Sequence, residues 1–191
     1  MVYATAHDPL CYPGTTVLIN LAGLTDQAEL DEFEFAMYLT RAEEPFPGGD
    51  LGYDHYRSIH HHLFQDVYGW AGQQRTIRIG KGGNWFCYPE YLASEMARVF
   101  SPDRIEAALA APDEESFAVQ TAALLADINA GHPFREGNGR TQLAYLALLA
   151  ATAGWDFDPG ALDPDRVISA MIDSFSTDLI ALTDLIADLI R

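Results

Sequence analysis

The sequence is poor in cysteine and in positive charge, and both shortages narrow its class. Cys11 and Cys87 are the only cysteines in 191 residues, and their separation fits no metal-ligand spacing. We expect two buried, reduced thiols, as in a reducing cytosol. Eleven basic against twenty-eight acidic residues give a net charge of −17. Because so acidic a surface repels a phosphate backbone, no nucleic-acid partner is expected.

Long apolar runs are also absent from the sequence. The most apolar segment, residues 143–153, is shorter than a membrane-spanning helix, so no membrane partner is expected. The first sixteen residues have no positively charged n-region, and His7 and Asp8 interrupt them, which argues against a signal peptide. These absences predict a cytoplasmic protein. The hydrophobic fraction of 49% indicates a globular chain with a sizeable core.

Most of the sequence shows the apolar spacing that is typical of α-helices. No repeat, low-complexity tract or flexible linker divides the chain, so we expect a single domain over residues 1–191, with its core at about 12–190. Segment 140–153 is apolar nearly all round and is expected at the centre of a bundle. The predicted fold class is all-α. Apolar spacing predicts helices over residues 18–39 (with a new cap at Thr25 or Asp26), 53–68, 89–100, 116–130, 140–153 and, as one or two helices, 164–191.

One stretch breaks the helical pattern. Residues 75–79 alternate polar and apolar side chains, a glycine turn follows at 80–83, and a second short run ends before Pro89. This pattern predicts one small β-hairpin within residues 74–88, lying on a helical body because a hairpin alone is marginal. A parallel sheet, or a helix through the glycine turn, would contradict the predicted fold.

The hairpin also carries positive charge that the rest of the chain lacks. Between Val67 and Pro89 there is no acidic residue, whereas Arg75, Arg78 and the only lysine, Lys81, lie there. A cluster of charges is usually a solvated face. Three positive charges in a chain of net charge −17 nevertheless mark a candidate contact surface.

The residues that can carry chemistry gather in one turn, residues 131–140, between two predicted helices. The second helix begins near Asn138 or Gly139, where backbone N–H groups and the positive end of the helix dipole form an anion site. Gly137 and Gly139 let the backbone approach a phosphate closely. Arg140 can add a guanidinium fork on phosphate oxygens.

Two further side chains of this turn suit phosphate transfer. Glu136 is a hard oxygen ligand, as Mg²⁺ shared with substrate phosphates requires. His132 titrates near neutrality and can take a proton from an attacking hydroxyl. Each residue alone is more often an ordinary cap, surface charge or turn residue. Their assembly within nine residues predicts a catalytic site.

The string from His132 to Arg140, HPFREGNGR, resembles the signature of the Fic family, His-Pro-Phe-x-(Asp/Glu)-Gly-Asn-Gly-Arg-x-x-Arg. Residues 12–15 resemble the N-terminal Tyr-Pro-Gly segment of that family, and residues 64–75 resemble its Tyr-x-Trp-Ala-Gly-x-x-Arg stretch. Residues 80–91 look like its flap hairpin. The resemblance covers most of the chain and implies a Fic-type helical bundle with one small β-hairpin flap.

This resemblance implies a protein adenylyltransferase that moves AMP from ATP to a Ser, Thr or Tyr hydroxyl of a target protein. His132 would be the catalytic base, and Glu136 would hold Mg²⁺ on the α- and β-phosphates. The nucleotide-binding residues would be Arg135, Gly137, Asn138, Gly139 and Arg140. The flap residues Ile79, Gly80, Lys81, Gly82 and Gly83 would bind the target.

Leu143 stands where the Fic signature has its second arginine, which in the family meets the terminal phosphate and pairs with an inhibitory glutamate. The inhibitory pattern Ser/Thr-x-x-x-Glu-(Gly/Asn) is incomplete here: Thr25 to Glu29 matches its first part, but Leu30 follows. The resemblance therefore implies the short, stand-alone toxin type, restrained by a separate small antitoxin protein.

Two alternatives stay open beside the adenylyltransferase. The donor could be UTP, GTP or CDP-choline, or the loss of the second arginine could leave a weakly active or non-catalytic nucleotide-binding module. The retention of His132 and Glu136 argues against loss of catalysis. The run from His60 to His62 does not favour a metal site, because successive helical residues point about 100° apart.

Replacing Leu143 by arginine tests the departure from the signature. If position 143 faces the nucleotide, Leu143→Arg regains a charged contact of about 1.5–3 kcal/mol, and kcat/KM for ATP should rise about tenfold or more. If Leu143 belongs to the core, the arginine lowers the melting temperature without kinetic gain. Unchanged kinetics with a large loss of melting temperature would show that position 143 does not face the nucleotide.

Overall fold

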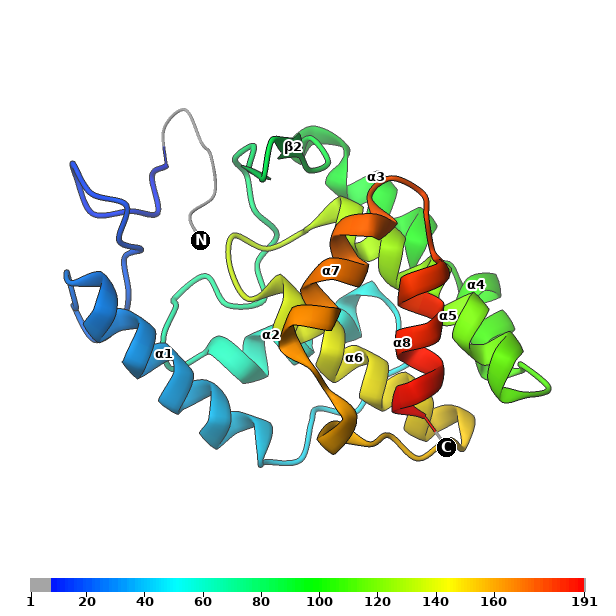
Figure 1. Cartoon of the computed structure of the whole chain (residues 1–191). Coiled ribbons are helices and arrows are strands. Elements are labelled where there is room, and N and C mark those ends of the chain that lie inside the picture. The colour runs from blue at the N-terminus through cyan, green and yellow to red at the C-terminus, as the bar shows by residue number, and fades with distance from the viewer. Residues whose placement is uncertain (1–7, 191) are drawn as a thin grey trace.

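The computed structural model describes residues 8–190, which are mostly helical (Figure 1). Two short strands, β1 (Gly80–Lys81) and β2 (Asn84–Trp85), pair antiparallel and form the only sheet of the described range. The predicted all-α fold with one hairpin is therefore confirmed. The helices of this range are α1 (Gln27–Ala42), α2 (Tyr53–Phe64), α3 (Pro89–Val99), α4 (Pro102–Leu109), α5 (Glu114–Gly131), α6 (Asn138–Ala153), α7 (Pro164–Ser174) and α8 (Ile180–Leu189).

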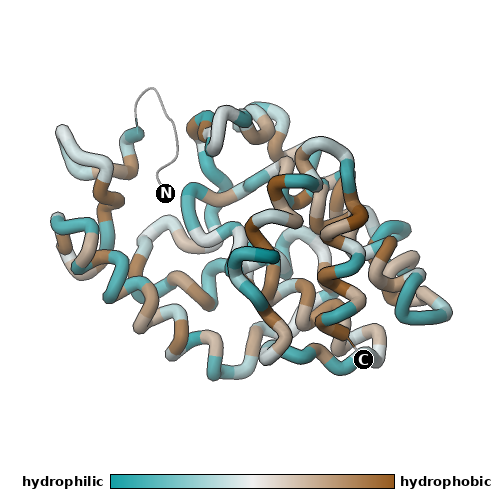
Figure 2. Tube along the Cα trace, viewed as in Figure 1, coloured by the Kyte–Doolittle hydropathy of each residue, from teal (hydrophilic) through white to brown (hydrophobic). Residues whose placement is uncertain are grey.

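Helices α5 and α6 form the middle of the bundle. Helix α5 contacts α3, α4, α6, α7 and α8, while α6 also contacts α2 and α4. Tyr145, Leu146, Leu149 and Ala150 of α6 are fully or almost fully buried, as its apolar composition predicts. Figure 2 shows apolar positions concentrated where these helices meet and hydrophilic positions recurring along α1 at the edge of the bundle. The turn that the sequence analysis predicts to be catalytic, residues 131–140, joins these two central helices.

Aspartate side chains fix where several helices begin. Asp26 accepts hydrogen bonds from Ala28 N and Glu29 N at the start of α1, and Asp113 accepts one from Ser116 N at the start of α5. Such caps satisfy N–H groups that have no partner inside the helix. The cap predicted at Thr25 or Asp26 is therefore found at Asp26.

The prediction of helix from residue 18 is wrong for its first part, since α1 begins only at Gln27. The Asn20 amide nitrogen donates to Leu18 O and Leu24 O at 3.0 and 2.7 Å, and Leu24 N donates to Asn20 Oδ1 at 2.9 Å. These local bonds favour a turn over helix. Gly23 lies in the left-handed region with φ 72° and ends any helical continuation.

The hairpin is shorter than the alternation predicts. The strand expected over residues 75–79 is not one, and pairing is limited to Gly80 with Trp85 and Lys81 with Asn84. Gly82 and Gly83 both have positive φ, at 59° and 86°, as a two-residue hairpin turn of the primed type requires. The Arg75 side chain, described below, holds the preceding segment by bonds to loop carbonyls instead of a strand ladder.

Three smaller expectations also change. Helix α2 ends at Phe64 and not near Tyr68, and α4 was not predicted. Cys11 and Cys87 are free thiols, as expected, but both are half-buried and not buried.

None of the described helices combines the length and apolar character that crossing a bilayer requires.

The central position of α6 makes a stability prediction. Leu149 is fully buried, so Leu149→Ala should lower the free energy of unfolding by about 2–5 kcal/mol. Leu148, its half-buried neighbour, offers a matched control, and Leu148→Ala should cost clearly less. Urea unfolding of both variants measures the difference. Equal losses would contradict the inward orientation of Leu149.

Candidate active site

Backbone conformation shapes the turn between α5 and α6. Helix α5 ends at Gly131, the following His132 lies in the left-handed region with φ 49°, and Gly137 precedes α6 with φ 79°. No side chain caps α6, in contrast to α1, α5 and α7. The N–H groups of its first turn therefore point out of the helix end without a side-chain acceptor, as an anion site requires.

The two glycines of the turn serve different purposes. A Cβ at Gly137 would lie 2.5 Å from the Phe64 ring, and Gly137 also has positive φ. This residue is therefore glycine for packing and backbone conformation, and not only to admit a phosphate. A Cβ at Gly139 would meet nothing within 4 Å, and the residue is exposed. Gly139 fits the predicted open approach to the helix end.

The His132 ring is buried and oriented. It stacks on Phe86 of the flap, with ring centroids 3.8 Å apart and an interplanar angle of 14°. Its Nδ1 lies 3.2 Å from Asn129 O, and because a carbonyl only accepts, Nδ1 donates. The lone pair is then on Nε2, as a general base requires. Burial lowers the pKa of His132 to about 3, so the ring is neutral at pH 7.

Arg75 ties the flap to this turn. Its buried guanidinium donates to His132 O at 2.7 Å, Gly131 O at 3.0 Å, Cys87 O at 2.6 Å and Ile77 O at 2.7 Å. Two of these carbonyls belong to the turn and two to the flap region. A single side chain thus fixes the position of the flap against the carbonyl of His132.

The turn is also held by a stack between the rings of Phe134 and His60. Phe134 is fully buried, and its centroid lies 3.8 Å from that of His60 on α2. His60 Nε2 donates to Glu136 O at 2.9 Å, while its Nδ1 accepts from Gly72 N at 2.8 Å. Burial lowers the pKa of His60 to about 3. This neutral histidine is a support of the turn that the sequence pattern does not reveal.

The three histidines of α2 point to three different places. His60 meets Glu136 O, His61 lies 3.2 Å from Ala71 O, and His62 lies 2.8 Å from Arg41 O. No group of three possible metal-ligating side chains occurs within residues 8–190. Each ring instead ties α2 to a neighbouring segment.

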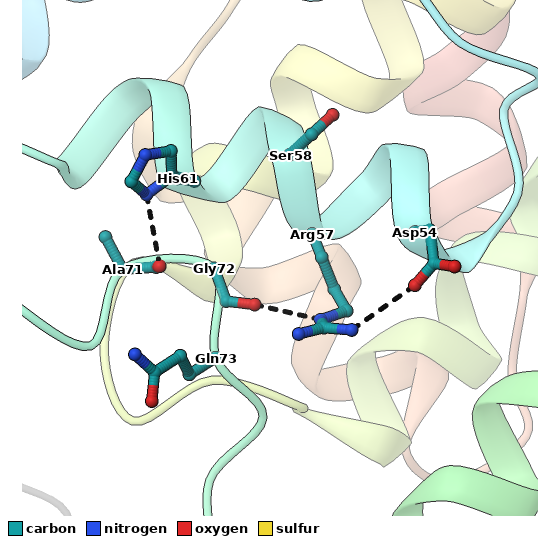
Figure 3. A pocket seen from close by; sticks show the side chains of 7 residues that line it. All are labelled: Asp54, Arg57, Ser58, His61, Ala71, Gly72 and Gln73. Carbon is teal, nitrogen blue, oxygen red and sulfur yellow. Dashed lines mark hydrogen bonds and ion pairs between the residues drawn. The ribbon is translucent and has the colours of Figure 1, made fainter.

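Helix α2 also pins the loop that follows Trp70 (Figure 3). Arg57 Nε donates to Gly72 O at 2.9 Å, and a Cβ on Gly72 would lie 2.9 Å from both Arg57 O and the His61 Cβ. An open hollow of about 290 Å³ remains between loop and helix. Its lining residues are Asp54, Arg57, Ser58, His61, Ala71, Gly72 and Gln73, none of which is a predicted site residue.

The Asn138 side chain is engaged in the turn itself. Its Nδ2 donates to Phe134 O at 2.8 Å, and its Oδ1 accepts from Phe134 N at 3.0 Å. Asn138 therefore shapes the loop. Only its backbone N–H, in the first turn of α6, is placed as the predicted phosphate contact requires.

Arg135 also has a partner within the protein. Its Nε lies 2.6 Å from Asp8 Oδ2, and both side chains are at least nine-tenths buried. This ion pair fastens the N-terminal segment to the turn. The assignment of Arg135 to the nucleotide stays a prediction, and the observed contact gives the residue a structural role.

Arg140 is oriented by α1, which sequence reasoning did not connect to the site. Glu34 Oε1 lies 2.5 Å from Arg140 Nη2, and the other Glu34 oxygen accepts a bond from Tyr68. The guanidinium also lies over the Tyr38 and Phe64 rings, 5.3 and 4.6 Å from their centroids. Tyr68 is the tyrosine of the Tyr-x-Trp-Ala-Gly stretch. Glu34 belongs to no motif, so no local signal could have found it.

Glu136 lies partly buried just before the start of α6. Its Oε1 accepts from Gly137 N at 3.0 Å, and burial raises the pKa of its carboxyl group. A hard carboxylate beside an uncapped helix start suits Mg²⁺, which typically binds one or two carboxylates together with substrate phosphates.

Leu143 lies one helical turn beyond Arg140 on α6. It is half-buried, whereas Gln142 and Tyr145 on the same helix are buried. Position 143 is thus at the margin of the core.

The predicted flap residues divide between two faces. Ile79 and Phe86 are buried and form a small apolar cluster under the hairpin. Gly80 is buried as well, and a Cβ there would lie 2.7 Å from Asn84 O. Lys81, Gly82 and Gly83 are exposed. Only these last three offer side chains or backbone to a partner at the tip.

The fold and the turn define a helical protein in which a buried neutral histidine, a helix start without a side-chain cap and a hairpin flap belong to one site. The chain belongs to the Fic/DOC family, whose sequence profile matches residues 50–150.

Named relatives agree with this assignment along most of the chain. The "Probable protein adenylyltransferase y4lH" of Sinorhizobium fredii is 55% identical over 178 residues, which cover 93% of this chain and 93% of that protein. The protein adenylyltransferase VbhT of Bartonella schoenbuchensis is 33% identical over 99% of this chain, which spans 39% of that longer protein.

Solved structures share the fold at lower identity. The N-terminal Fic domain of a Bartonella effector protein from Bartonella sp. AR 15-3 has a TM-score of 0.87 at 21% identity, covering 98% of this chain and 95% of that one. The BepC protein of Bartonella tribocorum, solved with bound AMPPNP, has a TM-score of 0.85 at 23% identity, with 95% and 96% covered. The Fic-type bundle is therefore confirmed.

The buried neutral histidines predict a loss of stability in mild acid. The unfolded chain binds a proton on His60 near pH 6.5, but the folded ring does so only near pH 3. Between these values the unfolded state holds more protons, so stability falls as the pH falls through this window. From pH 7 to pH 5 the loss due to His60 should be about 2 kcal/mol.

His60→Gln removes this contribution while keeping a donor and an acceptor. The drop in unfolding free energy between pH 7 and pH 5 should therefore be smaller by about 2 kcal/mol in the variant. His61→Gln makes the same change on an exposed ring of α2 and serves as the control. Identical pH dependence of all three proteins in urea unfolding would contradict the neutral, buried state of His60.

Proposed function

We propose that this member of the Fic/DOC family is a protein adenylyltransferase that transfers AMP from ATP to a Ser, Thr or Tyr hydroxyl of a target protein. The observation that carries the proposal is the His132 ring, held by Asn129 O so that Nε2 bears the lone pair, beside the uncapped start of α6. The names of the relatives at 55% and 33% identity support the same reaction.

The reaction follows from these positions. His132 Nε2 accepts the proton of the target hydroxyl, whose oxygen forms a bond to the α-phosphorus while the bond to the pyrophosphate oxygen breaks. Backbone N–H groups at the start of α6 and the Arg140 guanidinium stabilise the charge on the phosphates. A ring with a pKa of about 3 is a weak base by itself. The negative phosphates, once bound, raise that pKa by stabilising the imidazolium ion.

Glu136 is the residue that would hold Mg²⁺ in this site. A bound Mg²⁺ supplies Lewis-acid charge neutralisation to phosphate oxygens. The carboxylate itself is fixed by Gly137 N, which keeps one oxygen directed along the helix end. Glu34, the other acidic side chain near this turn, forms an ion pair with Arg140. Glu34 would therefore balance Arg140, while Glu136 would balance Mg²⁺.

The flap would hold the target segment. Phe86 contacts the His132 ring from the flap, so a segment bound along the hairpin lies next to the base. The exposed tip, Lys81 to Gly83, has backbone groups that an extended segment can reach. Arg75 fixes this geometry by joining the flap carbonyl of Cys87 to the turn.

The biological setting is the part of the proposal that rests on sequence alone. A cytoplasmic location follows from the composition, and the toxin role follows from the resemblance to short Fic proteins. The incomplete inhibitory pattern, in which Leu30 follows Glu29, supports restraint by a separate antitoxin protein. The half-buried Leu143 in place of a phosphate-binding arginine favours weak use of ATP, or another donor such as UTP, GTP or CDP-choline.

Intact-mass analysis tests the proposal directly. A cytosolic lysate is incubated with the protein and each of ATP, UTP, GTP and CDP-choline, and the mass increment on the modified protein identifies the transferred group. His132→Ala should abolish transfer and leave nucleotide binding nearly intact, because only proton removal is lost. Glu136→Ala should weaken both transfer and nucleotide binding, because the metal ligand is lost.

Three results would contradict the proposal. Full single-turnover activity of His132→Ala would exclude His132 as the base. An increment other than AMP would replace ATP as the donor. Nucleotide binding without an increment from any donor would favour a non-catalytic binding module.

A further inference from the structure

Arg78 is an exception among the arginines of this acidic protein. Arg75 is buried and bonds to four backbone carbonyls. Arg78 has neither a carboxylate nor a carbonyl partner among residues 8–190 and lies half-exposed on the flap. The other described arginines each form an ion pair with a carboxylate: Arg41, Arg57, Arg98, Arg104, Arg135, Arg140 and Arg166.

Two aromatic rings hold the Arg78 guanidinium. Its central carbon lies 4.4 Å from the centroid of Trp85 and 4.1 Å from that of Tyr88. The rings themselves are 49% and 44% exposed. The Nε–H is shielded from solvent and meets no acceptor in the described part of the chain. We call Arg78, Trp85 and Tyr88 the flap cage.

The flap cage lies on the outer side of the hairpin. Successive side chains of an extended segment point to opposite faces. Ile79 and Phe86, the sequence neighbours of Arg78 and Trp85, point inward, where Phe86 stacks on His132. Trp85 of the cage is therefore the sequence neighbour of Phe86, which contacts His132, and Tyr88 lies two residues beyond Phe86.

We propose that the flap cage binds a carboxylate of the target protein, so that the enzyme selects hydroxyl groups with a nearby Asp or Glu. This inference rests on the proposed function, because it assigns the substrate preference of the same site. The occupant is an extended segment of the target that carries its acidic side chain close to the modified residue.

The physical reason is the direction of the guanidinium edge. Contacts with the rings use the faces of the guanidinium and leave the edge formed by its two Nη groups for a planar acceptor. A carboxylate fits that edge with two parallel hydrogen bonds, and the aromatic walls strengthen them by excluding water. Lys81 adds positive charge at the tip, and no acidic residue lies between Val67 and Pro89.

The net charge of the protein makes this preference distinctive. A chain of net charge −17 repels an acidic segment at long range. An acidic preference therefore has to come from a local contact. The alternative is that Arg78 merely fastens the hairpin through its two ring contacts. That purely structural role predicts equal effects on acidic and neutral targets.

The test uses matched synthetic peptides and the complete protein without nucleotide. Each peptide has a central Thr and one Glu at a defined position beside it, and its partner has Gln at that position. Fluorescence anisotropy gives the Kd of both. At the best position, the Glu peptide should bind about tenfold more tightly than the Gln peptide. In Arg78→Gln the two Kd values should become equal.

Arg166→Gln on α7 is the matched control, because it removes the same charge from an exposed ion pair with Asp188. This variant should keep the tenfold preference. The proposal is overturned if no position shows a preference in the unmodified protein, if Arg78→Gln weakens both peptides equally, or if neither peptide binds below about 1 mM.

Transfer of labelled AMP from ATP to the same peptides separates the two levels of inference. Preference for the Glu peptide in binding without any transfer would support the flap cage and count against the proposed reaction. Transfer that is equal for Glu and Gln peptides would support the reaction and overturn the cage. Transfer that follows the binding preference, and loses it in Arg78→Gln, supports both.

Discussion

The buried guanidinium of Arg75 is the contact on which the active-site geometry most depends. It is 3% exposed and donates to four backbone carbonyl groups. A buried cation is stable only when its donors are paired. Because two acceptors belong to the turn and two to the flap region, neither can shift without leaving a buried polar group unpaired. The relative position of base and flap is thereby fixed before any ligand binds.

Burial away from water sets the charge states of the histidines around the turn. His60 and His132 are neutral because they are buried, and each uses one ring nitrogen to donate to a carbonyl. Glu34 balances Arg140, and Asp8 balances Arg135. The net charge of −17 is thus expressed mainly on the outer surface, while the backbone N–H groups at the start of α6 give the turn a local positive potential.

The sequence predicts the parts of the site that lie close together along the chain. The string from His132 to Arg140, the hairpin glycines and the apolar α6 follow from local patterns. It does not predict Glu34, His60 or Asp8, because each acts through a contact with a residue far away in the chain. The expected strand over residues 75–79 failed for a related reason. Its alternation was real, but the Arg75 side chain bonded to loop carbonyls and replaced the strand ladder.

The ion pair between Arg135 and Asp8 joins residues that are 127 positions apart. The bonds from Arg140 to Glu34 and from His60 to Glu136 span 106 and 76 positions. Contacts between distant residues require closure of long loops and form slowly relative to local helices. Helices α5 and α6 can therefore form while the turn between them is still loose. We therefore expect His132 to reach its final environment late in folding, after Asp8, Glu34 and His60 have met the turn between α5 and α6.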